Sequence, residues 1–409
     1  MPKLSKILLL AASVVLVLTI FLGVNSSGVS AASSEDDGAY RQINVYSEVL
    51  RHIQTDYVVD PNITAVTNGA LRGLLESLDA DSSYLTPDEY KLYKSDKAGK
   101  AQVGINVSKR YGYATVVSVV PGSPADKANL NDGDIIEAIG SQDTRELSLA
   151  MIQLLLAGQP GSELTLSVVR PRKATPEKVS MTRIASVLPP VAETMYENST
   201  ILYLKPGVLD HDHVQQIEAR LKAMPKAGNK KILLDLRDVA AGDMTEATRV
   251  ANFFLNSGTI ASLEGQKVQK QTFVADASKA INVTAPVVVL TNHGTAGPAE
   301  LVAAALLDNK RAELVGEKTF GEGAQQKTFD LPDGGALILS VAKYESPSGK
   351  KLQDEGVTPG VLVASSQDDV ASADDDATPT ETQPATVKPG VSIDEQLSKA
   401  LDLLKSKTS

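Results

Sequence analysis

Apolar residues follow different spacings in successive parts of the chain, and each spacing predicts a different architecture. Between residues 40 and 78 they recur every three or four positions, which predicts two amphipathic helices that pair as a hairpin. From 101 to 172, short apolar runs and a helical pattern over 148–157 predict a small, strand-rich module. After 179, apolar runs alternate with helical stretches of ten or more residues, which is typical of a mostly parallel sheet covered by helices. The pattern therefore predicts an α/β protein with several domains.

The most informative stretch runs from Pro286 to Gln326. A buried strand over 287–290 leads through a polar turn to a helix that opens at Pro298, and a second strand is followed by a glycine-flanked loop over 320–323. A turn that carries a small residue and backbone N–H groups to the N-terminus of a helix is a common place for a nucleophile and its oxyanion donors. We therefore expect this stretch to form the functional site.

The first 31 residues predict export. Lys3 and Lys6 precede an apolar run over residues 7–24, and Val29-Ser30-Ala31 offers a cleavage site of small residues. The run is long for the core of a signal peptide and long enough to span a bilayer. We expect a periplasmic or other extracytoplasmic protein, with residues 1–31 either cleaved as a signal peptide or kept as an inner-membrane anchor.

The composition changes again near the C-terminus. Residues 365–389 are rich in Asp, Ser, Thr, Pro and Ala, which predicts a disordered acidic linker. Residues 390–409 then predict an amphipathic helix that begins with a capping box of Ser392 and Glu395. We expect this helix to dock on a second protomer or on the chain's own N-terminal helices.

Composition also excludes some classes of function. The net charge of −10 and the pI near 5.1 argue against nucleic acid as a partner. Because the chain has no cysteine, disulfides, thiolate zinc sites and cysteine nucleophiles are excluded. His211 and His213 stand two positions apart at a helix start, so their imidazoles point to different faces and we expect solvated side chains. The sequence predicts no metal and no cofactor.

Three stretches carry recognisable motifs. Residues 292–300 read N-H-G-T-A-G-P-A-E, residues 316–326 read G-E-K-T-F-G-E-G-A-Q-Q, and residues 78–87 read L-D-A-D-S-S-Y-L-T-P. They resemble motifs of the carboxy-terminal processing peptidases, also called tail-specific proteases. In the same order, that family carries N-x-G-[ST]-A-S-A-S-E, G-E-x-T-F-G-K-G-x-x-Q and L-D-P-H-S-S-Y-L-T-P. With shorter matches further on, the resemblance covers roughly residues 40–363.

The resemblance implies an order of domains. It implies a helical region over 40–100, a PDZ domain over 101–172, and an α/β core of the ClpP and crotonase type over 173–364. The PDZ assignment depends on Gly-Ser-Pro-Ala at 122–125 and on the Leu-x-x-Gly-Asp-x-Ile run that begins at Leu130.

A PDZ domain binds an extended peptide as an added strand. The resemblance places the contact with the peptide's free carboxylate at Gly104, Ile105, Asn106 and Val107, beside the helix over 148–157. Gly104 occupies a glycine position of the family, whereas Asn106 replaces a usual glycine. The alternative is that these four residues form an ordinary edge strand. The partners that this implies are unfolded or C-terminal peptide segments of exported proteins.

The residues that carry the family's chemistry differ in this chain. In the family, the middle serine of the first motif is the nucleophile and the lysine of the second motif is its general base, but these positions hold Gly297 and Glu322. The residue after the nucleophile donates its N–H to the oxyanion, and Pro298 has no N–H. Gln326 matches the accessory glutamine that orients the lysine, with a polar role at a strand edge as the alternative.

The second oxyanion element is altered as well. Residues 234–242 resemble the family's L-D-L-R-N-N-P-G-G, whose glycines supply an oxyanion-hole N–H. Gly242 remains of that glycine pair, while Ala241 replaces the other. Ala241 can donate to an oxyanion only if its φ is allowed for a residue with a Cβ.

These replacements predict a pseudopeptidase that captures peptide tails without cleaving them, with a homodimer or an active relative as further partners. The alternative is an active serine-type endopeptidase that cleaves protein C-termini with a non-standard catalytic arrangement. One form of this alternative uses Glu322 as the general base for a water molecule. A third possibility is a purely structural role in assembly through the C-terminal helix. Gly297, Pro298 and Glu322 together favour the pseudopeptidase, because each disables a different part of acyl transfer.

Overall fold

The structure is a computed structural model that describes residues 34–95, 101–110, 112–171, 173, 175–185, 188–365 and 394–407. The predicted leader over 1–31 lies outside these residues, as does the predicted linker over 365–389 apart from Ser365, so both stay predictions. The chain forms two compact units, Met1–Thr67 and Asn68–Ser409. Of the helices in the described stretches, none combines the length and the apolar content that crossing a bilayer requires.

In the first unit, the described residues form helix α2 (Ser34–Asp56) and the start of α3 (Ile63–Glu76), which continues into the second unit. The two helices that the spacing between residues 40 and 78 predicts are therefore present. On α2, the apolar side chains of Ile43, Tyr46 and Val49 are exposed. The pairing of the two helices as a hairpin stays a prediction.

A short strand and a capped helix follow α3. β1 (Ser83–Leu85) pairs antiparallel with β18 (Ala336–Glu345), and α4 (Pro87–Lys94) begins just after β1. The Glu89 N–H donates to the Thr86 hydroxyl at 3.4 Å, and the Thr86 N–H donates to the Glu89 carboxylate at 2.8 Å. Together with the proline at the first helical position, this capping box fixes the start of α4.

A small antiparallel sheet with one longer helix forms the next module. Its strands run in the order β3-β4-β5-β7-β8, so β3 (Ile105–Arg110) is an edge strand. α6 (Leu149–Leu156) packs on this sheet and begins at Ser148, whose hydroxyl accepts a hydrogen bond from a first-turn N–H. β8 (Glu177–Thr182) pairs with β7, so the sheet extends beyond residue 172, where the sequence predicts the module to end. The other elements are β2 (Ala101–Gln102), β4 (Tyr113–Val119), α5 (Pro124–Lys127), β5 (Ile135–Ile139), β6 (Gln142–Asp143), η2 (Thr144–Glu146), β7 (Glu163–Val169) and β9 (Ile184–Ala185).

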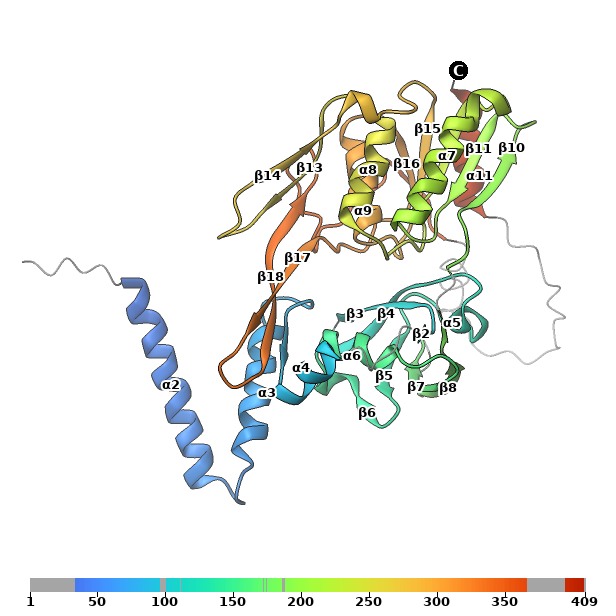
Figure 1. Ribbon diagram of the computed structural model, residues 1–409. Helices are drawn as coiled ribbons and strands as arrows, with labels where there is room; N and C mark the ends of the chain where they lie inside the picture. Colours follow the sequence, from blue (N-terminus) through green and yellow to red (C-terminus); the bar gives the residue numbers. More distant parts are fainter. Residues whose placement is uncertain are drawn as a thin grey trace, which may run out of the picture. The chain divides into compact units, whose positions relative to one another are not determined.

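The core is a six-stranded sheet (Figure 1). In order across the sheet, its strands are β10 (Ala192–Tyr196), β11 (Ile201–Lys205), β12 (Lys231–Asp235), β15 (Val287–Thr291), β16 (Glu313–Gly316) and β19 (Val361–Leu362). Neighbouring strands are parallel except for β10 with β11. Helices α7 (His211–Ala227), α8 (Met244–Phe254) and α9 (Pro298–Asp308) pack on one face. The mostly parallel, helix-covered sheet that the apolar runs predict is therefore confirmed.

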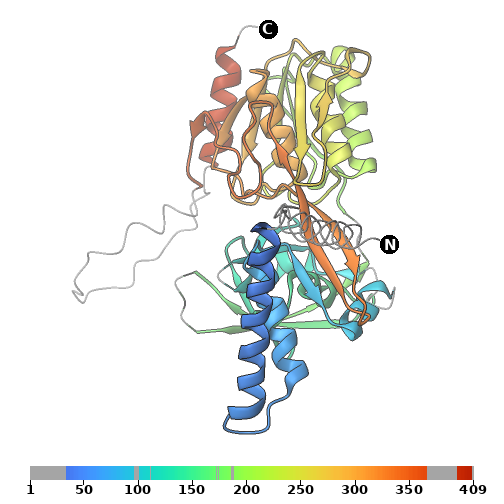
Figure 2. The same cartoon turned by 90° about the vertical axis from the view of Figure 1, so that its left-hand side faces the viewer.

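Helix α11 (Glu395–Ser406) covers the opposite face of the core sheet, as Figure 2 shows. Its Ala400 and Leu404 are fully buried in one cluster with Leu233 and Val288 of the sheet. The helix therefore docks on its own core and not at the sites that the sequence predicts. The physical reason is that a parallel sheet is apolar on both faces and needs a cover on each.

The start of α11 also differs from the prediction. Its N-cap is Asp394 and not Ser392, and the Asp394 carboxylate accepts a hydrogen bond from the Leu397 N–H at 2.9 Å. Aspartate and serine serve equally well at this position, so the two candidates could not be separated by residue type.

A second sheet carries the loop of the candidate site. It comprises β1, β18, β13 (Thr259–Glu264) and β14 (Gln271–Val274), with β17 (Ala324–Asp330) paired to β18. The long β18 pairs with β1, β17 and β13 along its length. The short helix η3 (Ala277–Lys279) follows β14. Because β17 starts at Ala324, the loop over 320–323 connects the core strand β16 to this second sheet.

Candidate functional site

The centre of the candidate site is the turn between β15 and α9. β15 ends at Thr291, and α9 begins at Pro298 with Gly297 as its N-cap. Gly297 has φ 54° and ψ −115°, a conformation that is strained for any residue with a Cβ. A sharp, strained turn from a strand into a helix is the backbone form of a nucleophile elbow. The chain keeps this backbone form although the side chain at its apex is missing.

The turn is fastened to the loop that follows β12. The Ala296 N–H donates to the Val239 carbonyl at 3.0 Å, and the Thr295 hydroxyl donates to the Leu236 carbonyl at 2.9 Å. Thr295 is completely buried, so its hydroxyl faces this loop and is not available as a nucleophile. His293, in contrast, is exposed on the outside of the turn.

The structure brings Gly297 and Glu322 together. A Cβ built on Gly297 would lie 3.9 Å from the Glu322 carboxyl carbon and 3.9 Å from one of its oxygens. The nearest other atom is the Ala240 carbonyl oxygen, at 3.6 Å. All three distances are ordinary van der Waals contacts, so the site has room for a side chain at position 297. The acid at 322 faces the place where the family carries its nucleophile.

Glu300 holds the two halves of this arrangement together, a role that the sequence reasoning missed. Its fully buried carboxylate accepts hydrogen bonds from the N–H groups of Gly297 at 2.9 Å, Gly321 at 2.8 Å and Glu322 at 2.7 Å. It also accepts one from the Thr319 hydroxyl. Burial raises the pKa of Glu300 to about 7, against the opposite effect of these donors. The start of α9 and the loop over 320–323 are thereby joined through one carboxyl group.

A cavity of about 360 Å³ opens beside Glu322. Glu322 remains exposed to the solvent in this cavity. Its surroundings raise its pKa to about 8, through desolvation and through the nearby carboxylates of Asp81 and Glu300. Desolvation and the carboxylate of Asp79 raise the pKa of Asp81 to about 6. The cavity is lined by Ala80, Asp81, Ser108, Lys109, Phe320, Gly321, Glu322, Gln353 and Asp354.

Asp81 also differs from the family, whose motif has histidine at this position. The sequence analysis did not single out this difference. Gln353 Nε2 donates to Asp81 Oδ2 at 3.1 Å, and the Gly323 N–H donates to Gln353 Oε1 at 2.7 Å. Gln326, the match to the accessory glutamine, donates to the Asp81 backbone carbonyl at 2.7 Å. Gln326 thus supports the segment that carries Asp81, and Gln353 links that segment to the loop over 320–323.

The oxyanion side of the site lacks one backbone donor, at Pro298, while Ala241 is not among the described residues with a positive φ, so its backbone conformation is allowed for a residue with a Cβ. Pro298 has no N–H, and the atom of the opposite loop that lies nearest to position 297 is the Ala240 carbonyl oxygen. A Cβ on Gly242 would lie 2.5 Å from the Leu209 carbonyl oxygen, so packing against Leu209 requires glycine there. The Ala241 carbonyl oxygen accepts from the Leu209 N–H at 3.0 Å. Gly242 is therefore explained without any role in binding an oxyanion.

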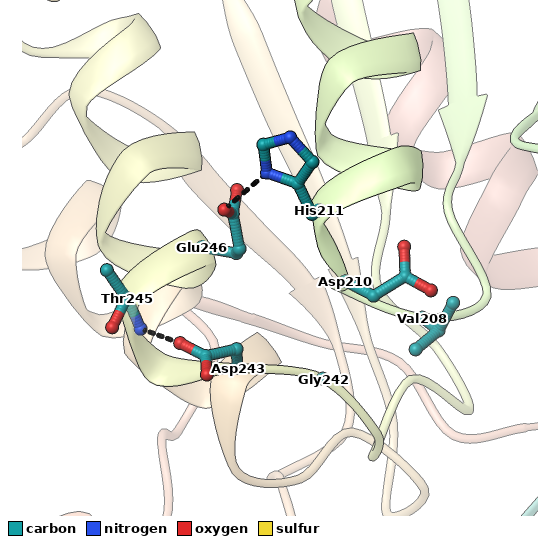
Figure 3. Close-up of a pocket in the computed structure, with 7 residues that line it drawn as sticks. All are labelled: Val208, Asp210, His211, Gly242, Asp243, Thr245 and Glu246. Atoms are coloured by element: carbon teal, nitrogen blue, oxygen red, sulfur yellow. Dashed lines mark hydrogen bonds and ion pairs between the residues drawn. The ribbon is translucent and has the colours of Figure 1, made fainter.

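Gly242 lines a second, shallow pocket of about 550 Å³ together with residues of the first turns of α7 and α8 (Figure 3). In it, His211 Nδ1 and Glu246 Oε1 are 2.9 Å apart and link the first turns of α7 and α8. His213 is buried and bonds to Asp210 at 2.6 Å, so the prediction that both histidines are solvated is wrong for His213. The described residues contain no group of three or more metal-ligating side chains placed to hold an ion.

Gly104 shapes the start of the edge strand in the small module. It has φ 84°, and a Cβ there would lie 2.3 Å from the Ser123 Cβ. Its carbonyl oxygen accepts from the Val120 N–H at 2.8 Å. Asn106 Nδ2 donates across the sheet to Ser118 Oγ at 2.8 Å, while Val107 is buried. In the part of the chain that the structure describes, β4 is the strand paired with β3, and the other edge of β3 pairs with no strand.

Comparisons with known proteins agree with this architecture. Residues 115–170 match the family model of the PDZ domain, and residues 201–363 match that of peptidase family S41. The solved structure of a photosystem II D1 C-terminal processing protease has a TM-score of 0.65 and 24% identity. It covers 78% of this chain and 92% of that chain. The likeness shows that the two proteins share a fold.

Curated relatives define the class more closely. A carboxyl-terminal-processing protease of Picosynechococcus is 33% identical over 72% of this chain and 72% of its own length. The carboxy-terminal processing protease CtpA of Bacillus subtilis is 29% identical over 88% of this chain and 76% of its own length. A chloroplastic carboxyl-terminal-processing peptidase of Arabidopsis thaliana is 30% identical, and the chain spans 60% of that relative. The chain belongs to the carboxyl-terminal-processing protease family.

Proposed function

We propose that this protein is a pseudopeptidase, which binds unfolded or C-terminal peptide tails through its PDZ domain without cleaving them. The observation that carries this proposal is Gly297, which stands at the apex of an elbow-type turn and has no side chain to act as a nucleophile. Loss of a nucleophile alone reduces kcat by about 10⁶-fold in comparable enzymes.

The surroundings of Gly297 support the same proposal. Pro298 cannot donate an N–H to an oxyanion, and removing one such donor costs about 10²–10³-fold in kcat. Glu322 carries a carboxyl group where the family has an amine, and with Gly297 there is no serine hydroxyl for it to deprotonate. The serine-type alternative therefore lacks a nucleophile, and the water-based alternative lacks the N–H donor that Pro298 has removed.

The binding part of the proposal depends on the edge strand β3. A peptide that adds to β3 gains backbone hydrogen bonds, and in PDZ domains the helix that faces this strand gives side-chain selectivity, a role that we propose for α6. Gly104 keeps the left-handed backbone at the head of β3 where a free carboxylate meets N–H groups in such modules. We place the protein outside the cytoplasm on the basis of residues 1–31, with exported proteins as its clients. A homodimer or an active relative is a further partner that we propose.

The binding proposal is tested by fluorescence anisotropy with two labelled peptides of the same apolar sequence, one with a free C-terminus and one amidated. We expect binding of the free form and at least tenfold weaker binding of the amidated form. Equal affinity for both peptides, or no binding of either, would contradict recognition of tails by the PDZ domain.

A matched pair of glycine variants localises the binding. Gly104→Ala and Gly122→Ala both introduce a Cβ at a positive φ, but the new Cβ meets Ser123 at 2.3 Å in the first case and nothing within 4 Å in the second. We expect Gly104→Ala to weaken binding of the free-carboxylate peptide and Gly122→Ala to leave it within about twofold. A reversed order would move the peptide site away from β3.

A further inference from the structure

Helix α11 lies outside residues 201–363, the part of the chain that the peptidase family model matches. It is nevertheless joined closely to that part, because Gln396 Nε2 donates to the Val363 carbonyl at 2.9 Å. The match to that family model therefore gives no information on α11. The contacts at the two ends of the helix suggest a role.

The N-terminal end of α11 is held by Arg237, just beyond the end of β12. Arg237 Nη1 donates to Asp394 Oδ1 at 3.0 Å and to Gln396 Oε1 at 3.2 Å. Its Nη2 donates to Asp235 Oδ2 at 2.6 Å, and Asp235 is completely buried. Burial alone would raise the pKa of Asp235, but the Arg237 guanidinium holds it below the usual range. Asp394, Arg237 and Asp235 therefore form one charged chain from the helix to the sheet.

The C-terminal end of α11 is held by the first residue of the same strand. Lys231 Nζ donates to the Leu404 carbonyl at 2.6 Å, which satisfies a free carbonyl and complements the negative end of the helix dipole. Between the two ends, Ala400 is fully buried against the sheet. Lys231 at the start of β12 and Arg237 just after its end therefore hold the two ends of α11.

Asp238, the residue after Arg237, is hydrogen-bonded to the turn between β15 and α9. Asp238 has φ 63°, a left-handed conformation that is strained for a residue with a Cβ. Its N–H donates to Asn292 Oδ1 at 3.0 Å, and its Oδ1 accepts from Asn292 Nδ2 at 2.7 Å. Asn292 is the first residue of the turn that ends at Gly297. Consecutive residues therefore hold α11 and the site turn.

The loop after Asp238 also contacts the turn at Ala296 and Gly297. The Val239 carbonyl accepts from the Ala296 N–H, and the Ala240 carbonyl oxygen lies 3.6 Å from the Cβ position of Gly297. A strained backbone of this kind persists only while its surroundings hold it. Asn292 and Lys205 hold the Asp238 side chain directly, and the contacts of Arg237 with α11 hold the residue before it.

We propose that α11 is an allosteric ligand carried by the chain itself, which fixes the site turn through Arg237 and Asp238 when it is docked on the sheet. Undocking of α11 removes Asp394 and Gln396 from Arg237, which then keeps its bonds to Asp235. The loop after β12 is then held less firmly, which lets Asp238 leave its left-handed conformation more often and loosens the turn around Gly297. This inference goes beyond the proposed function, because it holds whether or not the PDZ domain binds tails.

Amide hydrogen exchange on the full chain tests the coupling, with the N–H groups of Asp238 and Ala296 as reporters. Ala400→Glu places a carboxylate against the apolar sheet and undocks α11, while Asp394→Ala removes its N-cap and its bond to Arg237. We expect both variants to speed exchange of the two reporter amides at least tenfold. The amides of β15 report global unfolding and are expected to stay protected.

Two further variants separate the Arg237 contact from general damage to the helix. Asp394→Asn keeps an N-cap side chain but loses the charge that pairs with Arg237, so it is expected to have an intermediate effect on the reporters. Lys407→Ala removes the exposed ion pair with Glu313 at the other end and is expected to leave the reporters within twofold. The proposal is overturned if α11 exchanges freely in Ala400→Glu while Asp238 and Ala296 keep their protection, or if β15 opens with them in every variant.

Discussion

The carboxyl group of Glu322 lies 3.9 Å from the place that a Cβ would occupy on Gly297. A carboxylic acid therefore faces an empty position in the geometry where the family pairs a base with a nucleophile. The turn keeps its strained backbone, and Glu300 still ties it to the loop of Glu322. Gly297 and Glu322 therefore stand where the family motifs have serine and lysine, on a backbone that Glu300 holds in place.

The first prediction is that the turn tolerates a side chain at its apex. Gly297→Ser puts a Cβ into ordinary contacts of 3.6 and 3.9 Å, so its cost is the backbone strain of about 1–3 kcal/mol. Urea denaturation should show a decrease in the free energy of unfolding of this size. Gly242→Ser is the control, because its Cβ would lie 2.5 Å from the Leu209 carbonyl oxygen, and it is expected to be the more destabilising change. The reverse order would contradict the room that we assign to position 297.

The second prediction concerns pH. The pKa of Glu322 rises from its ordinary value of 4.5 to about 8 in the folded chain, so between these values the folded state binds the proton more tightly than the unfolded state. The contribution of Glu322 to stability is therefore present below pH 4.5 and is lost as the pH rises to about 8. Glu322→Gln mimics the protonated form, so it should gain stability relative to the natural chain over this range.

The same titration has an internal control. The pKa of Asp81 rises from 3.8 to about 6, so the gain in Asp81→Asn should be complete at a lower pH than the gain in Glu322→Gln. Thermal unfolding at intervals of half a pH unit measures both curves. The prediction is contradicted if the stability gains of Asp81→Asn and Glu322→Gln follow the same curve against pH. It is also contradicted if the gain of Glu322→Gln does not depend on pH.

The third prediction is that Glu300 is the main support of the site. Glu300→Gln replaces one acceptor oxygen by an NH₂ group that faces buried donors, which should lower the free energy of unfolding by about 2–4 kcal/mol. Glu355→Gln changes an exposed glutamate and should stay within about 0.5 kcal/mol of the natural chain. If the two changes lower the free energy of unfolding equally in urea denaturation, Glu300 is not the main support of the site.

The features that the sequence predicts are those with a local signal. The start of α9 at Pro298 and the capped start of α4 follow from residues next to each other, and the apolar runs predict the core strands. The approach of Glu322 to Gly297 could be expected only because two motifs resemble a family with known geometry. Local signals therefore fix the starts of α4 and α9, whereas at α11 two residues suit the cap and the structure uses Asp394 and not Ser392.

Other features depend on residues far apart in the chain and could not be predicted from it. Asp81 approaches Glu322 through folding of distant segments, so its effect on the Glu322 pKa has no local signal. The docking place of α11 depends on which face of the sheet lacks a cover, and α7, α8 and α9 settle that only in three dimensions. His213 is buried because Asp210 and the Pro189 carbonyl meet its ring, which its spacing from His211 does not reveal.

The fourth prediction concerns restoration of activity. Gly297→Ser, Pro298→Ala and Glu322→Lys together return the nucleophile, an N–H donor and an amine. Asp81 then faces the new lysine, keeps it charged and weakens it as a base. Addition of Asp81→His, the residue of the family motif, should therefore raise the rate of cleavage above that of the triple variant. An unchanged rate would show that Asp81 does not act on position 322.

The central claim is tested most directly by mass spectrometry of an unstructured substrate with an apolar free C-terminus, incubated with the natural protein and with the quadruple variant. If the protein is the pseudopeptidase that we propose, the natural protein yields no fragments and the variant, which regains serine and lysine, yields defined fragments. Fragments from the natural protein that persist in the presence of serine-directed reagents would contradict the account, and they would point to Glu322 and a water molecule as the source of hydrolysis.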